Sequence, residues 1–157
     1  ASPEEVKKSF TMPLSEMIKD SDETLLRVIH YPPMKGNEEQ GAIRAAAHED
    51  INLITLLCSA TAAGLEVKDI DGNWHSVPCD PGSIAINAGD MLQMASNGYY
   101  KSTTHRVVNP MGADAKLPRY SMPLFLHPRP DVVLSKDITA GQYLKQRLTE
   151  IGLLKNK

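Results

Sequence analysis

The chain has 157 residues, a length that suits one domain able to bury roughly 70% of the surface that its unfolded form exposes. Its 41% hydrophobic and 23% charged residues are ordinary for a soluble globular protein, and a net charge of −2 gives no electrostatic reason to expect nucleic acid or an anionic membrane as partner. The apolar stretches are too short to span a bilayer. The two cysteines form neither a CxxC pair nor a disulfide framework, so we expect a cytoplasmic protein.

The N-terminus has the pattern of a helix start. Ser2 is a candidate N-cap, Pro3 suits the first helical position, and Glu5 stands three residues after the cap, as in a capping box. This helix is expected to end before Pro13, and a second short helical turn is expected at residues 15–19.

The middle of the chain is dominated by short β-type segments. Runs rich in Val, Ile and Leu, bounded by Gly, Pro, Asn or Asp, indicate strands. These strands are expected at residues 24–31, 43–47, 53–58, 83–87 and 120–127. Two hairpins are expected as well, one joining 65–70 to 74–77 and one joining 91–95 to 99–108 through Asn97-Gly98. Many short strands with helices only at the ends predict a mainly β fold, either a barrel or a double-sheet jelly roll.

The C-terminal part returns to a helical pattern. Apolar residues at helical spacing predict an amphipathic helix over residues 139–151, and Gly152 is expected to end it. The whole chain is then one domain. Its expected parts are a partial N-terminal helical segment at 1–22, a jelly-roll core at 23–134 and a C-terminal helix at 135–157.

The most informative motif is His48-Glu49-Asp50, followed much later by His105. Side chains at i and i+2 point to the same face of an extended strand, and a histidine on a neighbouring strand can complete three ligands on one side of a metal. Two imidazoles and one carboxylate with open opposite positions are typical of non-haem Fe(II) oxygenases, although the same set also accepts Zn, Co or Ni. Taken alone, His-x-Asp is a weak signal, because surface histidines often lie near aspartates.

A second pair of residues suits the binding of a carboxylate. Arg119 offers a planar fork of donors, and Ser121 adds a hydroxyl on the same strand face. If that face is buried, Arg119 requires an anion, because an unpaired buried charge is very costly. Tyr31 is a third candidate donor, although a tyrosine at a strand end beside prolines is often only packed there.

With these residues in order, the chain resembles the 2-oxoglutarate/Fe(II)-dependent dioxygenases of the isopenicillin N synthase-like group. The resemblance runs from about residue 25 to the C-terminus. It rests on His48-Glu49-Asp50, Thr55-Leu56-Leu57, Asn87-Ala88-Gly89-Asp90, Asn97-Gly98, Lys101 through Val107, Arg119-Tyr120-Ser121, and the segments Leu26 through Pro33 and Phe125 through Asp131.

The resemblance implies a double-stranded β-helix, or jelly roll, with iron bound by His48, Asp50 and His105. It also implies that Arg119 and Ser121 hold 2-oxoglutarate, with Tyr31 as a helper and ascorbate as an auxiliary reductant. The implied activity is oxidation of an unknown small molecule by O2 through abstraction of hydrogen from a C–H bond, with release of succinate and CO2.

Two other functions remain open at this point. One is an iron oxidase of the isopenicillin N synthase or aminocyclopropane-carboxylate oxidase kind, which needs no keto acid. The other is a non-catalytic, metal-binding jelly-roll fragment. Because members of the group usually carry a longer N-terminal region, we expect one flank of this core to be apolar and exposed, which favours a homodimer.

Overall fold

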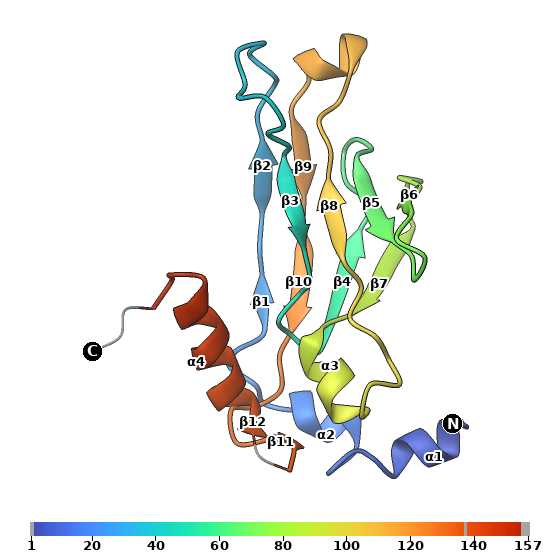
Figure 1. The fold of residues 1–157 in the computed structure, drawn as a ribbon, viewed down its shortest axis with the longest axis vertical. Helices are drawn as coiled ribbons and strands as arrows, with labels where there is room; N and C mark the ends of the chain where they lie inside the picture. The colour runs from blue at the N-terminus through green and yellow to red at the C-terminus, as the bar shows by residue number, and fades with distance from the viewer. Residues whose placement is uncertain (1, 137, 155–157) are drawn as a thin grey trace.

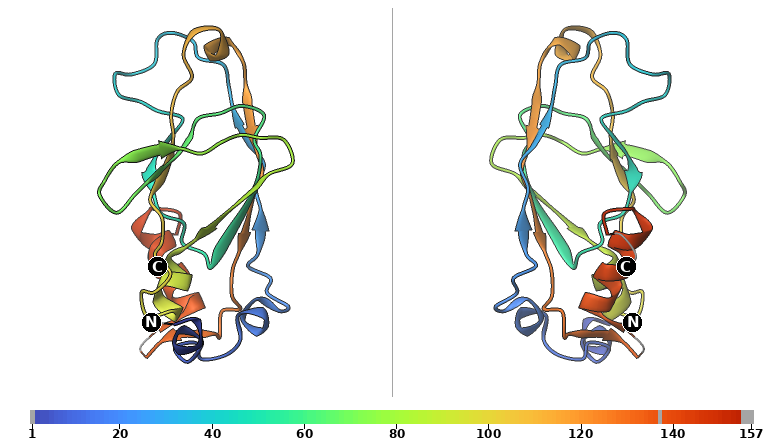
Figure 2. Two further views of the ribbon diagram at one scale, coloured as in Figure 1. Left: turned by 90° about the vertical axis from the view of Figure 1, so that its right-hand side faces the viewer. Right: turned by 90° about the vertical axis from the view of Figure 1, so that its left-hand side faces the viewer.

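Two four-stranded antiparallel sheets form the body of the protein in the computed structural model, which describes residues 2–136 and 138–154 (Figure 1). The first sheet has the order β1 (Leu25–Leu26), β10 (Pro123–Leu126), β4 (Ile54–Cys58) and β7 (Ile84–Ala88). The second has the order β3 (Ala45–His48), β8 (His105–Val107), β5 (Leu65–Lys68) and β6 (Trp74–Ser76). Figure 2 shows the sheets as two facing layers, which confirms the expected jelly roll.

A separate two-stranded ladder continues the first sheet at one end. Strand β2 (Ile29–Tyr31) pairs with β9 (Arg119–Ser121), above β1 and β10 in Figure 1. The strands expected at 24–31 and 120–127 are therefore each divided into two short strands. Pro123 is the first residue of β10, a position that tolerates proline because a residue without an N–H cannot donate to the ladder.

Helices close the other end of the sheets. They are α1 (Pro3–Lys7), α2 (Leu14–Ile18), α3 (Asp90–Ala95) and α4 (Ala140–Glu150), joined by the small ladder of β11 (Val133–Ser135) and β12 (Ile138–Thr139). The Ser2 side chain and Glu5 form the expected capping box of α1, and Gly152 follows α4 with a φ of 77°. None of the helices in the described ranges is long and apolar enough to cross a bilayer.

The hairpin expected around Asn97-Gly98 is wrong. Residues 90–95 form helix α3, whose Met91, Leu92 and Ala95 are buried. A short apolar run fits a buried helix as well as a strand, and Met, Leu, Gln and Ala are all good helix formers. The Gly98 N–H donates to the carbonyl of Gln93 at 2.7 Å, so the left-handed Asn97-Gly98 pair ends the helix. Strand β8 begins only at His105.

The apolar core lies among these helices rather than between the sheets. Its buried members are Met17, Leu53, Met91, Leu92, Ala95, Val132, Leu134 and Ala140, from α2, α3, α4, β11 and the segments beside them. The helical end of the molecule is therefore a packed base, and the space between the two sheets is left for a cavity.

The outer face of the first sheet is apolar. Leu26, Leu124, Leu56 and Ile86 stand in register across its four strands, and the two outermost, Leu26 and Ile86, are largely exposed. The expected apolar flank is therefore present in the described chain. The homodimer inferred from it, the three segment boundaries and the cytoplasmic location stay predictions. Residues 1, 137 and 155–157 of the expected end segments lie outside the described residues.

Candidate metal centre

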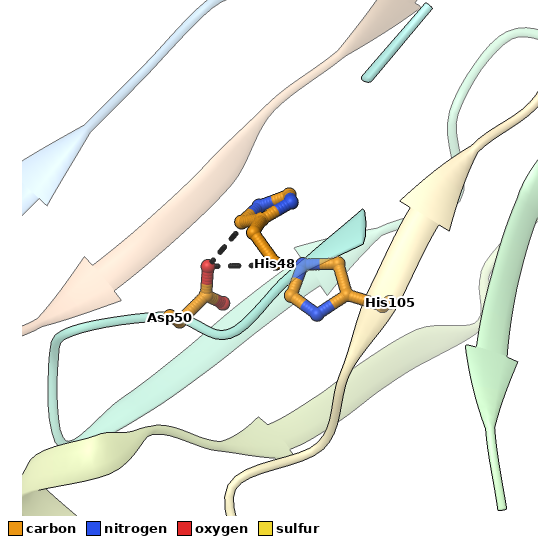
Figure 3. A group of neighbouring side chains, drawn as sticks. All are labelled: His48, Asp50 and His105. Carbon is orange, nitrogen blue, oxygen red and sulfur yellow. Dashed lines mark ion pairs between the residues drawn. The ribbon is translucent and has the colours of Figure 1, made fainter. Parts of the chain in front are cut away.

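His48, Asp50 and His105 converge on one point between the sheets (Figure 3). The Nε2 atoms of His48 and His105 lie 3.9 and 3.7 Å from Oδ1 of Asp50, and one ligand atom from each residue lies within 4.8 Å of the others. His48 stands opposite His105 in the β3–β8 pairing. In the described part of the chain, no other group of three His, Cys, Asp or Glu side chains comes together in this way.

The strand expected to carry both His48 and Asp50 ends at His48. Asp50 lies two residues beyond it in the loop that leads to β4, and it is only 7% exposed, whereas His48 is 48% exposed. The β3–β8 register also shifts between Ala45 and His48. The common direction of the two side chains therefore comes from the loop and a β-irregularity rather than from regular strand alternation.

Backbone carbonyls orient both imidazole rings. Nδ1 of His48 lies 2.7 Å from the carbonyl oxygen of Ala46, and Nδ1 of His105 lies 3.0 Å from that of Thr103. A carbonyl only accepts, so each Nδ1 carries the hydrogen, and in this tautomer the lone pair lies on Nε2. Both free lone pairs belong to the atoms nearest Asp50, which is the arrangement that a metal ion requires.

Two residues that sequence reasoning missed orient the Asp50 carboxylate. The Thr55 hydroxyl donates to Oδ2 at 2.6 Å, and the Asn87 amide donates to the same oxygen at 3.0 Å. With Oδ2 engaged, Oδ1 is the oxygen turned toward the histidines. The signal was a polar residue inside each of two otherwise apolar strands, β4 and β7.

Gly89 brings the end of β7 against the Asp50 loop. A Cβ at this position would lie 2.2 Å from the carbonyl oxygen of Asn52 and 2.8 Å from that of Asp50. The next residue, Asp90, donates its N–H to the Asp50 carbonyl at 2.8 Å. Its carboxylate accepts a 2.8 Å hydrogen bond from the Tyr143 hydroxyl of α4. The metal-side loop is thus fixed to the helical base.

Arg119 and Ser121 lie on one face of β9 and are only 2% and 5% exposed. The Arg119 Nε donates to the carbonyl of Ala62 at 2.9 Å, but its buried Nη1 has no hydrogen-bond partner. Burial is the main cause that lowers the pKa of Arg119 below its usual value. Among the described residues, no carboxylate lies within 4 Å of this guanidinium. A buried cation with an unpartnered donor is chemically matched to an anionic ligand.

Tyr31 stands beside this pair. It lies opposite Arg119 in the β2–β9 ladder, and the Arg119 Cζ is 5.3 Å from the centroid of its ring. The structure therefore brings all six candidate residues into one region.

A single cavity of about 320 Å³ joins the two groups of residues. Its lining includes the three candidate metal ligands, Arg119, Ser121 and Tyr31. Most of the remaining wall is apolar, with Leu57, Val67, Val107 and Phe125 among its members. The candidate metal ligands and the Arg119 guanidinium therefore line the same largely apolar cavity.

Residues 23–128 match the sequence profile described as the 2OG-Fe(II) oxygenase superfamily. The chain belongs to this superfamily. The match covers more than half of the chain and confirms the family inferred from its motifs.

Curated proteins and solved structures of the superfamily agree with this placement. A 2-oxoglutarate-Fe(II) type oxidoreductase of Aspergillus fumigatus is 38% identical over 109 residues, which are 69% of this chain and 31% of that protein. Gibberellin 2-beta-dioxygenase 1 of Arabidopsis thaliana is 38% identical over 73% of this chain and 36% of its own length. The chain thus spans about a third of these relatives.

The solved structures give broader coverage. A putative oxygenase from Shewanella oneidensis has 61% identity and a TM-score of 0.86, over 98% of this chain and 57% of that one. A full-length Neurospora crassa protein, solved in complex with alpha-KG, has 34% identity and a TM-score of 0.72, over 82% of this chain and 44% of that one. Both contain substantial chain beyond the part that matches.

Proposed function

We propose that this oxygenase-family chain carries an Fe(II)- and 2-oxoglutarate-dependent active site that oxidises a small organic molecule. His48, Asp50 and His105 would hold the iron, and Arg119 and Ser121, assisted by Tyr31, would hold 2-oxoglutarate. The observation that carries the proposal is the shared cavity, which has three converging ligand atoms at one end and an unpartnered buried guanidinium at the other.

The residues present fit an iron ion. Two imidazoles that present their Nε2 atoms and one carboxylate oxygen form the donor set that suits Fe(II) and leaves further positions open. Thr55 and Asn87 hold the carboxylate in the orientation that this set needs, as groups behind metal ligands commonly do.

The opposite end fits a dicarboxylate. Arg119 would donate to the carboxylate remote from the metal, so that its Nη1 gains the partner that it lacks. Ser121 and Tyr31 would add hydroxyl donors on either side. The apolar residues of the wall would lower the local dielectric constant around a bound dicarboxylate, which would strengthen each of these polar contacts.

Bound iron would supply the redox chemistry: O2 is the oxidant, and it takes two electrons from 2-oxoglutarate, which becomes succinate and CO2, and two from a substrate C–H bond. The protein's own contribution is the orientation of the ligands and the placement of substrate near the metal.

No single substrate is assigned. By their names, the relatives act on different molecules, such as gibberellin and feruloyl CoA, and one structure of the Neurospora crassa protein contains thymine. We therefore propose only the class of small organic molecules, since substrate contacts in a given fold vary from protein to protein.

The test is succinate formation by the purified chain with Fe(II), ascorbate, 2-oxoglutarate and O2. We expect slow succinate release without substrate, faster release with a true substrate, and loss of both in His105→Ala. Oxygen consumption without succinate across a substrate screen would favour the oxidase. Metal binding with neither succinate nor oxygen consumption would favour the non-catalytic fragment. Ascorbate dependence is measured in the same assay and stays a prediction.

A further inference from the structure

We propose that Arg44 is a positioning residue for 2-oxoglutarate, acting through Tyr31. The inference rests on the proposed function and extends it to a residue outside the ligand-binding set. Arg44 itself does not line the cavity, whereas Tyr31 does. Arg44 therefore makes no direct contact with a ligand in the cavity, and a positioning effect must be transmitted by a neighbour.

The Arg44 guanidinium joins the ends of two strands. Its Nη2 lies within hydrogen-bond distance of two carbonyl oxygens, that of Pro32 at 3.3 Å and that of Leu117 at 3.2 Å. Pro32 follows β2 directly, and Leu117 comes two residues before β9. This bridge stands at the end of the β2–β9 ladder where Tyr31 faces Arg119.

The same guanidinium also packs on Tyr31. Its Cζ lies 5.9 Å from the centroid of the tyrosine ring, and the Cζ of Arg119 lies 5.3 Å from it. Contact with a cation stabilises an aromatic ring electrostatically, and contact with two cations restricts the positions that the ring can take. Arg44 thus holds Tyr31 from outside the cavity, while Arg119 holds it from within.

Arg44 further connects the two halves of the proposed site. It directly precedes β3, whose last residue is His48, while Tyr31 and Arg119 belong to β2 and β9. In the described ranges, β3 pairs only with β8 and β2 pairs only with β9, so no backbone ladder joins these strands. The Arg44 side chain supplies a direct link between the metal-side strand and the cosubstrate-side strands.

The Arg44 position is specific to arginine. Its buried Nε has no hydrogen-bond partner, and its charge adds to the positive field around Arg119, which lowers the pKa of Arg119 further. The hydrogen bonds to Pro32 and Leu117 and the contact with the Tyr31 ring must offset the unpaired Nε and the repulsion between the two arginines. Lysine would keep the charge, but its compact ammonium lacks the planar guanidinium that contacts two carbonyls through Nη2 and also packs against the Tyr31 ring.

The experiment is calorimetric titration of 2-oxoglutarate into the full chain loaded with Mn(II), which takes the same ligands. We expect Arg44→Lys to weaken binding about tenfold, as loss of one well-placed hydrogen bond would, with Mn(II) affinity unchanged. Arg147→Lys is the matched control, because Arg147 is also half-buried with an unpartnered Nε but lies in α4, at the opposite end of the molecule (Figure 1). It should bind 2-oxoglutarate like wild type.

A double-mutant cycle separates positioning from general support of the fold. If Arg44 acts through the Tyr31 hydroxyl, Tyr31→Phe should weaken binding about tenfold, and Arg44→Lys should add almost nothing in that background. Wild-type binding by Arg44→Lys, or fully additive effects, would overturn the proposal. If Arg44→Lys does not fold, Arg44→Gln takes its place, and misfolding of both would assign Arg44 to folding and reject the positioning role. Failure of the proposed function looks different, because wild type would then bind Mn(II) but no 2-oxoglutarate.

Discussion

Asp50 and Asn87 are separated by 37 positions in the chain, yet the Asn87 amide donates a 3.0 Å hydrogen bond to Oδ2 of Asp50. Thr55 donates to the same oxygen at 2.6 Å. Asn87 and Thr55 belong to β7 and β4, neighbouring strands of a sheet that contains none of the three proposed metal ligands. One sheet therefore orients the carboxylate, while the two histidines come from the other.

Asn87→Ala should weaken metal binding without removing a ligand. The Asp50 carboxylate would lose one of its two fixed donors and turn more freely, so we expect Mn(II) affinity to fall by about 10- to 100-fold. Titration of the apo chain with Mn(II) measures this. Asn73→Ala, in the exposed turn between β5 and β6, is the control and should bind like wild type. Equal affinities in all three proteins would mean that Asn87 does not orient the ligand.

Gly89→Ala should destabilise the fold and weaken metal binding together. Its Cβ would have to push away two backbone carbonyls, those of Asn52 and Asp50, which are fixed in the metal-side loop. We expect a loss of about 2–4 kcal/mol in the free energy of unfolding by urea. Gly36→Ala is the control: that glycine has a φ of 81° but open space around it, so its loss should stay near 1 kcal/mol, about the strain of a left-handed residue. A smaller loss at Gly89 than at Gly36 would contradict the steric argument.

Most of the strand pattern could be predicted from the sequence, because alternation and turn residues are local signals. The hairpin of β5 and β6 is an example. Helix α3 could not be predicted, since Met91 and Leu92 are apolar in either conformation. Only contact with the core formed by α2, β11 and α4 decides for the helix. The position of the apolar core could not be predicted either, because its residues come from segments far apart in the chain.

The six candidate residues of the site were all named from local spacing and family motifs, and the structure places them in one cavity. The roles of their partners were not predicted. Thr55 and Asn87 appeared among the family motifs, but their hydrogen bonds to Asp50, like the contact of Arg44 with Tyr31, join residues that no spacing in the sequence pairs. His48 and Asp50 were paired on the assumption that both lie on one face of a strand. That assumption is partly wrong, because the strand ends at His48 and Asp50 lies in the loop beyond it.

Arg119→Met should have opposite effects on stability and on ligand binding. Methionine fills similar space without a buried unpaired charge, so we expect the free energy of unfolding without ligand to be unchanged or higher by about 1 kcal/mol. Saturating 2-oxoglutarate should stabilise Mn(II)-loaded wild type by about 2.7 kcal/mol at 100 times its Kd, but leave the variant unaffected. Urea denaturation with and without the keto acid measures both.

Arg129→Met is the contrasting control for this prediction. Arg129 donates from its Nη1 to the backbone carbonyls of Glu16 and Lys19, so it links the C-terminal end of α2 to the segment between β10 and β11. Its loss should destabilise the protein but preserve stabilisation by 2-oxoglutarate. If Arg119→Met were instead stabilised by the keto acid as much as wild type, Arg119 would not be the carboxylate-binding residue.

Tyr143→Phe should remove part of the protein's sensitivity to alkaline pH. Burial, followed by the hydrogen bond to Asp90, raises the pKa of Tyr143 above its usual value of 10. Because the folded state keeps this proton more strongly than the unfolded state, the contribution of Tyr143 is fully present below pH 10 and is lost as the pH rises further. The variant should be less stable than wild type at about pH 8, where Asp90 loses a donor, and this difference in the free energy of unfolding should narrow by about pH 11.

Urea denaturation across this pH range measures the difference in the free energy of unfolding. Tyr99→Phe, at an exposed tyrosine, is the control, and its difference from wild type should not change with pH. A constant difference between Tyr143→Phe and wild type at all pH values would show that the buried hydroxyl does not titrate with unfolding.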